Sequence, residues 1–318
     1  MAAISRLPPV LKRTRRKMSS LAHREAIWGL IFLSPWLIGF LIWTFLPMVL
    51  SLVFSFTDFN LLKPDEWRFI GFENYVHFFH DPQVKKSAWV TLRFMLIAVP
   101  VGLAVPLALA AMVNSKSLWA KPVFRTLFYM PYIVPLISVV YIWRGFLGTY
   151  TGWLNRFLES IGIPGPEWLD NVTWIYPALV IIGLWGAGNA MVIMLAGMQN
   201  VPTELYDAAR VDGAGPLRVF FHITIPMISP VIFYNLILIL IGAFQYFLIP
   251  WVIKGTTVGD PGGSTFFYNM YLFKTFFIYD EMGYAATLAW ILFFTALAVT
   301  LLLFGTMKYW VYYAGGEE

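Results

Sequence analysis

The amino-acid sequence predicts an all-α membrane protein with six transmembrane helices, both termini in the cytoplasm and a cytoplasmic helix between spans 4 and 5. Of its 318 residues, 59% are hydrophobic and only 12% are charged, whereas soluble domains usually carry about 25% charged residues. The 28 Phe and 14 Trp residues suit the aromatic belts that form at membrane interfaces. A surface covered largely by lipid explains this composition.

Six apolar stretches are long enough to cross a bilayer, which takes about 20 helical residues. They lie near residues 27–56, 88–113, 124–146, 174–199, 228–250 and 284–307. Prolines 131, 135, 226 and 230 lie in or beside the third and fifth stretches. Membrane helices tolerate proline where neighbouring groups satisfy the freed carbonyls, so kinks are expected there. The first stretch is too long for the apolar core of a signal peptide, which favours an uncleaved first helix.

Basic residues set the predicted orientation. The N-terminal tail, residues 1–26, carries a dense Lys and Arg cluster at positions 12–17 and is expected inside the cell. The transmembrane domain then spans 27–308, and 309–318 form the C-terminal tail. The formal net charge of +5 does not indicate nucleic-acid binding, because the basic residues gather beside the spans. The absence of cysteine excludes disulfides and thiolate metal sites.

The segment 200–226 is unusually polar for a chain of this composition. Pro202 suits the first turn of a helix, and Glu204 and Asp207 then lie near the positive end of its dipole. Gly213 is placed to end that helix in a left-handed conformation. The face expected to be small and weakly apolar comprises Leu205, Ala208, Ala209 and Asp212, at i, i+3, i+4 and i+7.

Two locations remain open for this helix on physical grounds. A helix resting on lipid headgroups usually carries Lys and Arg on one face and bulky anchors on the other. Here the first helix offers alanines and acids, which favours a groove in a soluble partner protein.

The spacing within this segment resembles a known motif. Asp207-Ala208-Ala209, three residues, Gly213, nine residues, Ile223, one residue and Ile225-Pro226 are similar to the EAA motif of ABC importer membrane subunits, with Asp in place of Glu and Ile in place of Leu. The run ARVDGA resembles the carbohydrate-permease branch, and stretches such as SPWLIGFLIWTFLPMVLSLVFSFTDFN and MGYAATLAWILFF have similar counterparts there. The chain is identified as a member of that family, of the larger-partner, maltose-permease-like type.

The resemblance implies a set of partners. In this family two related permease subunits enclose a pathway, two ATPase subunits dock beneath them, and an extracytoplasmic binding protein delivers the substrate. It implies a multi-pass protein of a bacterial or archaeal cytoplasmic membrane, in contact with membrane lipid. The expected ATPase-coupling residues are Glu204, Asp207, Ala208, Ala209, Asp212 and Gly213. The chain has no G-x-x-x-x-G-K-[ST] phosphate loop, so ATP and Mg²⁺ are expected on the partner ATPase, with no cofactor or catalytic residue here.

The predicted substrate pathway rests on polar and aromatic residues at membrane depth, which are costly unless they face a cavity or another helix. These residues are Trp185, Asn189, Asn235, Phe244, Gln245 and Tyr246. Trp185 and Asn189 fall at i and i+4, so they are expected on one helical face. Bonds between helices are the alternative role for these amides. Arg144 lies near the outer end of the third span, where its side chain can snorkel to the interface.

The expected function is import of a di- or oligosaccharide as a non-catalytic permease subunit. A sugar-related anion, such as glycerol phosphate or an acidic oligosaccharide, remains an alternative substrate. An ion-coupled secondary transporter is disfavoured, because no inverted repeat is visible and the acids lie almost wholly in loops. The outer loop 255–284 contains DPGGST and MGY elements similar to the family's. It is expected either to contact the binding protein or to be a flexible loop without a partner.

Overall fold

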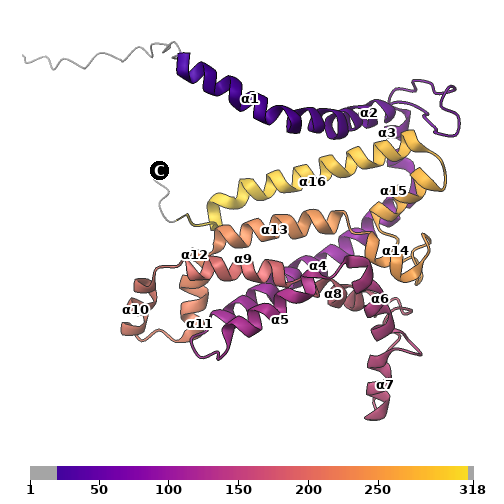
Figure 1. The fold of residues 1–318 in the computed structure, drawn as a ribbon. Coiled ribbons are helices and arrows are strands. Elements are labelled where there is room, and N and C mark those ends of the chain that lie inside the picture. Colours follow the sequence, from indigo (N-terminus) through magenta and orange to yellow (C-terminus); the bar gives the residue numbers. More distant parts are fainter. Residues whose placement is uncertain (1–19, 314–318) are drawn as a thin grey trace, which may run out of the picture. The chain divides into compact units, whose positions relative to one another are not determined.

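The computed structural model describes residues 20–313, and these are almost entirely helical (Figure 1). The described residues contain no strand beyond one isolated bridge between Thr57 and Phe69. By length and composition, three helices can cross a membrane unaided: His23–Phe54, Pro82–Asn114 and Met282–Trp310. Three further pairs of helices qualify if each bent pair forms one span. The predicted all-α class is confirmed, whereas the basic cluster at 12–17 and the end of the C-terminal tail lie outside the described residues.

Residues up to Val53 form one unit and the rest of the chain forms a second. In the first unit, α1 (Ser20–Phe40), the π-helix η1 (Leu41–Phe45) and α2 (Leu46–Phe54) run on without a break. Neither η1 nor α2 buries any residue, as expected of an apolar helix surrounded by lipid. The π-turn ends two residues before Pro47. The wider turn accommodates the proline ring, which would otherwise clash with the carbonyl four residues earlier.

The second unit is built around one long helix. After the short helix α3 (Glu73–His80), α4 (Pro82–Asn114) packs against five later helices, namely α5, α8, α9, α13 and α15. Asp81 begins α4 by accepting a hydrogen bond from the Gln83 N–H at 2.8 Å, a common N-cap arrangement.

The remaining predicted spans are broken rather than straight. α5 (Lys121–Ile133) meets α6 (Leu136–Leu147) at 101°. The helical stretch Pro216–Met227 meets α13 (Ser229–Phe244) at 71°. Prolines lie at both breaks, so the kinks predicted there are confirmed. The break of 56° between α8 (Ile175–Leu184) and α9 (Gly188–Gln199) was not predicted, and a straight helix over 174–199 is therefore wrong.

Gly188, directly after the break between α8 and α9, allows close packing of α9 against α5. A Cβ atom on Gly188 would lie only 2.1 Å from the Phe128 carbonyl oxygen of α5. Glycine at this position therefore lets the start of α9 lie directly against the backbone of α5.

The other helices lie in the loops or close the bundle. They are α7 (Trp153–Ser160), α10 (Thr203–Val211), α11 (Pro216–Val219), the π-helix η2 (Phe220–Thr224), α12 (Ile225–Met227), α14 (Leu248–Lys254), α15 (Tyr268–Phe277) and α16 (Met282–Trp310). α16 buries residues only in its first two turns, between Met282 and Leu288. It packs there against α15 and α3, and it also contacts α13.

Two hydrophobic clusters hold the second unit together. The aromatic cluster joins α4, α8, α14, α15 and α16 around residues such as Phe94, Phe267 and Tyr271. The methionine cluster joins α4, α9 and α13 around Met191, Met194 and Met198. Each cluster packs against a different part of α4, so this helix connects the two.

Candidate coupling surface and substrate pathway

The helix predicted between spans 4 and 5 is α10, and its ends are formed by local sequence. Pro202 precedes it and Glu204 lies in its first turn. Gly213 follows it with φ +72°. The Gly213 N–H donates to the Arg210 carbonyl at 3.1 Å and the Ala214 N–H to the Ala209 carbonyl at 2.9 Å. This pair of bonds is a Schellman motif, which requires the left-handed residue that glycine provides. The predicted left-handed ending at Gly213 is confirmed.

α10 is exposed over most of its length, and three of the four residues of the predicted stripe, Leu205, Ala208 and Asp212, are exposed. Glu204, Asp207, Ala208 and Asp212 are exposed, and so is Val211, whose exposed fraction is 88%. Ala209 is 9% exposed, so it is the one residue of the predicted stripe that is buried against the chain itself. Arg210 forms an ion pair with Asp207 on this surface.

Tyr206 fastens α10 to the rest of the molecule. Its ring packs against the methionine cluster, and its hydroxyl lies 3.2 Å from the Thr224 Oγ1 in η2. Thr224 is buried, and η2 leads through α12 into α13. α10 is therefore linked by a side chain, as well as by the backbone, to the helix that begins span 5. Sequence reasoning missed Tyr206, because only the arrangement of η2 shows its partner.

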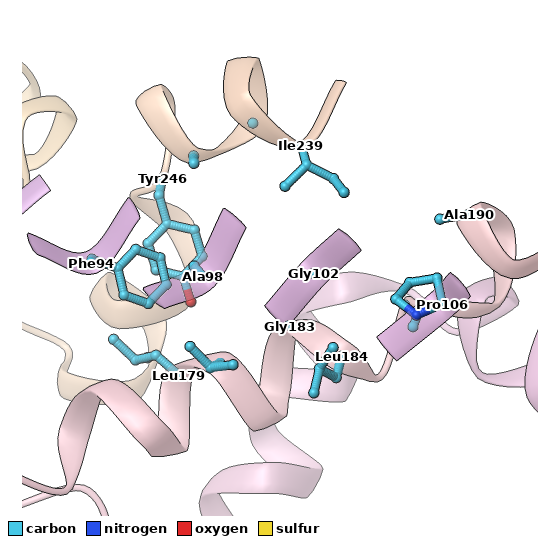
Figure 2. Close-up of a pocket in the computed structure, with 15 residues that line it drawn as sticks. Phe94, Ala98, Gly102, Pro106, Leu179, Gly183, Leu184, Ala190, Ile239 and Tyr246 are labelled. Carbon is cyan, nitrogen blue, oxygen red and sulfur yellow. The ribbon is translucent and has the colours of Figure 1, made fainter. Parts of the chain in front are cut away.

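A first internal cavity, the bundle cavity, lies between α4, α8, α9 and α13 and has a volume of about 260 Å³ (Figure 2). Phe94 and Tyr246 stack at one end, with ring centroids 4.5 Å apart. Pro106 and Ala190 lie toward the other end. The lining is otherwise apolar, and the Tyr246 hydroxyl is buried without a hydrogen-bond partner among the described residues.

A second space, the break cavity, has a volume of about 440 Å³ and lies where two spans are interrupted. It is lined by Pro131, Tyr132, Val134, Leu136, Val139, Ile182, Gly183, Trp185, Gly186 and Ile249. The Trp185 ring meets Trp143 of α6 edge-on, with centroids 5.6 Å apart. The indole N–H groups of both residues are buried, and neither has a partner in the part of the chain that the structure describes. Two donors with unused bonding capacity therefore lie beside the break in span 4.

Comparison with known proteins identifies the chain. Residues 102–314 match the profile of the family described as binding-protein-dependent transport system inner membrane component. The chain belongs to this family. It is also 37% identical over 306 residues to the probable ABC transporter permease protein YesP of Bacillus subtilis (strain 168), a match that covers 95% of this chain and 97% of that protein. The resemblance drawn from the EAA-like motif is confirmed, and the chain is an ABC transporter permease.

Other relatives of the permease carry carbohydrate names. The arabinooligosaccharides transport system permease protein AraP of Bacillus subtilis (strain 168) is 31% identical over 274 residues, covering 86% of each chain. The sulfoquinovosyl glycerol transport system permease protein SmoG of Agrobacterium fabrum (strain C58 / ATCC 33970) is 34% identical over 255 residues, covering 80% of this chain and 82% of the relative.

A solved structure shares the fold of the permease. The bacterial alginate ABC transporter in complex with an alginate pentasaccharide-bound periplasmic protein contains a chain that aligns with a TM-score of 0.74. The alignment covers 90% of the permease and 95% of that chain, at 22% identity. An alignment at this identity shows the fold alone.

The permease separates the six predicted pathway residues instead of gathering them in one site. Trp185 lines the break cavity and Tyr246 the bundle cavity. Trp185 follows α8 whereas Asn189 lies in α9, beyond the break. Their placement on one face of a continuous helix is therefore wrong, because the i, i+4 rule holds only within one helix.

The other predicted pathway residues line neither cavity. Asn235 is 2% exposed, and its amide donates to the Val231 carbonyl one turn earlier at 2.8 Å. Gln245 follows the end of α13 and is exposed, and Phe244 is half-buried beside it. Trp143 was missed by sequence reasoning, although its place on the far side of the Pro131 and Pro135 kink was a usable signal.

Proposed function

We propose that this permease imports a sugar, of di- or oligosaccharide size, in an ATP-driven complex whose ATPase docks on α10. The observation that carries the proposal is α10 itself: an exposed helix with the EAA-like sequence, ended by Gly213 and tied to η2 through Tyr206 and Thr224. The names of its relatives, for arabinooligosaccharides, sulfoquinovosyl glycerol and lactose, support the substrate class.

The proposal includes an assembly and an orientation. Two ATPase subunits bind ATP and Mg²⁺, a second permease subunit completes the pathway, and an extracytoplasmic binding protein delivers the sugar. The complex lies in a bacterial or archaeal cytoplasmic membrane with both termini of this chain inside. The exposed apolar side chains of Leu205, Val211 and Leu217 give the docking surface apolar area to bury against the ATPase.

The chain offers a route from α10 to the membrane. A displacement of α10 is carried by the Tyr206–Thr224 contact and by the continuous helical stretch from Pro216 to Met227. That stretch ends at the 71° bend before α13, and α13 contributes Ile239, Gly242 and Ala243 to the bundle cavity. Closure of the ATPase dimer is therefore expected to change the shape of this cavity. Span 5 is the element that moves in this mechanism.

The break cavity is the proposed place of sugar contact in the membrane. Transporters commonly bind their substrates where broken helices meet near the midplane. Aromatic faces and two unpaired indole N–H donors, on Trp143 and Trp185, match the apolar faces and hydroxyl acceptors of a sugar.

The coupling role of α10 is tested by two matched substitutions in the reconstituted complex. Valine at position 213 is strained, because the native φ is +72°, a region that β-branched residues avoid. Valine at Gly215 is unstrained, since its φ is −69° and nothing lies within 4 Å of the added Cβ. We expect Gly213→Val to hydrolyse ATP while transport per ATP falls about tenfold or more, and Gly215→Val to behave like the parent. Equal transport per ATP in both variants would overturn the coupling role of α10.

The substrate class is tested by uptake into proteoliposomes that contain the whole complex and its binding protein. The panel is lactose, maltose, arabinotriose, an alginate oligosaccharide and glycerol phosphate. Uptake of the neutral sugars supports the proposal, and uptake of glycerol phosphate alone overturns it.

A further inference from the structure

A polar cavity of about 670 Å³ lies at the C-terminal ends of α6 and α14, apart from the two cavities described above. In the proposed orientation this end faces outward, and the space is called the outer cavity here. It is lined by Arg144, Gly148, Thr151, Leu169, Asp170, Ile253, Lys254, Asp260, Pro261 and Gly262. None of these residues belongs to the coupling surface or to the predicted pathway.

One carboxylate of the outer cavity is held in place from two sides. The Lys254 ammonium lies 2.7 Å from the Asp170 Oδ1, and the Thr149 hydroxyl donates to Oδ2 at 2.5 Å. The hydrogen bond from Lys254, and then that from Thr149, lower the pKa of Asp170 below its ordinary value. Asp170 therefore stays ionised at neutral pH. A carboxylate has about four acceptor positions, so it retains capacity for further donors.

The other two charged groups have unused bonding capacity. Asp260 accepts one long hydrogen bond, from the Thr256 hydroxyl at 3.4 Å. Arg144 is exposed and forms no ion pair or hydrogen bond of its side chain within residues 20–313, although its charge acts on Asp170. The five N–H donors of its guanidinium are thus free. Snorkelling to the membrane interface accounts for the position of the Arg144 guanidinium. It does not account for the two carboxylates that line the same cavity.

Helices α6 and α14 connect the outer cavity to the break cavity. On α6, Leu136 and Val139 line the break cavity and Arg144 the outer one. On α14, Ile249 lines the break cavity and Ile253, one turn further, the outer one. α6 and α14 pack against each other. A molecule leaving the outer cavity along this pair of helices would reach the break cavity, which Trp185 lines.

We propose that the outer cavity is a second sugar-binding site, a vestibule that holds an uncharged polyhydroxylated substrate before it enters the membrane. This inference rests on the proposed sugar import. In this site the adjacent hydroxyl groups of the sugar donate hydrogen bonds to the carboxylates of Asp170 and Asp260. The same hydroxyl groups accept hydrogen bonds from the guanidinium of Arg144. Two acids and two bases line the cavity, so it has no net charge to attract an acidic sugar. This balance favours neutral sugars.

The absence of cysteine from the chain allows a direct test by thiol labelling. Thr151 lines the outer cavity, is exposed and makes no side-chain hydrogen bond in the described structure. Thr151→Cys would place the only thiol of this chain in the cavity, and Glu159→Cys on α7 would place it outside. Both variants are labelled with a membrane-impermeant maleimide in the assembled complex, without binding protein. The added sugar is maltose, lactose or arabinotriose, whichever the complex imports.

We expect the imported sugar to slow labelling at position 151 about tenfold when its concentration is about ten times its Kd. Labelling at position 159 should not change. Adding Arg144→Ala should abolish protection at 151, whereas Arg156→Ala, on α7 and outside the cavity, should retain it.

Two results would overturn the vestibule. One is a complex that imports a panel sugar while the same sugar leaves the labelling rate at 151 unchanged. The other is protection by sugar-free binding protein alone, which would make the cavity part of a protein interface. A complex that imports no sugar of the panel contradicts the proposed function itself, and is recognised by the uptake assay.

Discussion

The unbroken and the broken spans of this permease differ in how many side chains they bury and in whether they line cavities. α1–η1–α2 and α16 bury few side chains, and those of α16 lie in its first two turns. The three bent pairs line the cavities or lie next to α10: α5–α6 and α8–α9 meet at the break cavity, and the stretch Pro216–Met227 with α13 lies behind α10. α4 is unbroken but central, because both hydrophobic clusters pack against it. A continuous apolar run thus coincides with an exposed helix or with the central α4, and the interruptions coincide with the cavities and with the approach to α10.

The largest effect is expected at the closest contact of a broken span. Gly188→Val would bring side-chain atoms against the Phe128 carbonyl, which lies 2.1 Å from the position of a Cβ. Backbone cannot yield at this distance, so α5 and α9 would separate. We expect little or no monodisperse protein in detergent by size-exclusion chromatography. Gly305→Val, in unbroken α16 with nothing within 4 Å of its Cβ, is the matched control. Equal yields from the two variants would contradict the packing described for α9.

A smaller effect is expected from the indole donors of Trp185, which lines the break cavity, and of Trp143, which packs against it. Trp143→Phe and Trp185→Phe retain an aromatic ring and remove the N–H that the structure leaves unpaired. A neutral hydrogen bond contributes about 1 kcal/mol, which corresponds to about a fivefold loss of sugar transport rate. Trp36→Phe, at an exposed position of α1, should leave transport unchanged in the same proteoliposome assay. A uniform response of all three variants would argue against a site at the break.

The contact that ties α4 to α15 and α16 tests the unbroken scaffold. Asp81 is 4% exposed and accepts hydrogen bonds from the hydroxyls of Tyr271 and Tyr284. Asp81→Asn retains an N-cap acceptor but loses the charge, so we expect a loss of about 1–3 kcal/mol of stability and a lower Tm of the purified complex. Asp65→Asn, in an exposed loop, should not change the Tm. A Tm unaffected by Asp81→Asn would remove this contact from the scaffold.

The same carboxylate gives a pH dependence with a definite sign. Burial raises the pKa of Asp81, but the hydrogen bonds from Tyr271, Tyr284 and the Gln83 N–H outweigh it, and the net pKa lies below the ordinary value of 3.8. A group whose pKa is lowered on folding stabilises the protein above its unfolded pKa and loses this effect as pH falls through the folded one. The Tm difference between the parent and Asp81→Asn should therefore shrink only below about pH 4. A difference that shrinks between pH 8 and 5 would point to another group.

The smallest effect is expected on the lipid face of an unbroken span. Leu302 in α16 is exposed, and lipid tails are as apolar as the side chain itself. Leu302→Ala should therefore change stability by less than about 0.5 kcal/mol. Leu195→Ala, at a buried position of α9 in the methionine cluster, should cost about 2–5 kcal/mol. Comparable Tm values for the two variants would erase the distinction between the two kinds of span.

What the sequence could predict depended on how local each feature is. Six apolar stretches indicated the spans, and prolines indicated two of the breaks, because both signals lie within one helix. The third break has no proline. Glycines 183, 186 and 188 mark it, but glycine is also common in unbroken membrane helices. The left-handed ending at Gly213 was predictable because a Schellman motif involves only neighbouring residues.

The candidate site was less predictable because it depends on residues far apart in the chain. Trp143 and Trp185 are brought together by two bends, and neither bend angle is written in the local sequence. Ala209 is buried one turn after Tyr206, whose hydroxyl contacts Thr224 between α10 and η2. The residue types suited to a sugar were recognised, yet Asn235 proved to bond its own helix. Side-chain chemistry identified candidates, and only the backbone arrangement decided among them.

The π-turn η2, just before Pro226, has one further consequence. A π-turn is an α-helix with one residue more than the regular repeat needs, and each residue rotates a helix by about 100°. The number of residues between Pro216 and Pro226 therefore determines the direction in which α10 presents its exposed face. Deleting one residue from η2 would turn α10 by more than a quarter of a revolution about the axis of the helix that follows. One residue more or fewer in η2 therefore decides the direction in which α10 presents its exposed face.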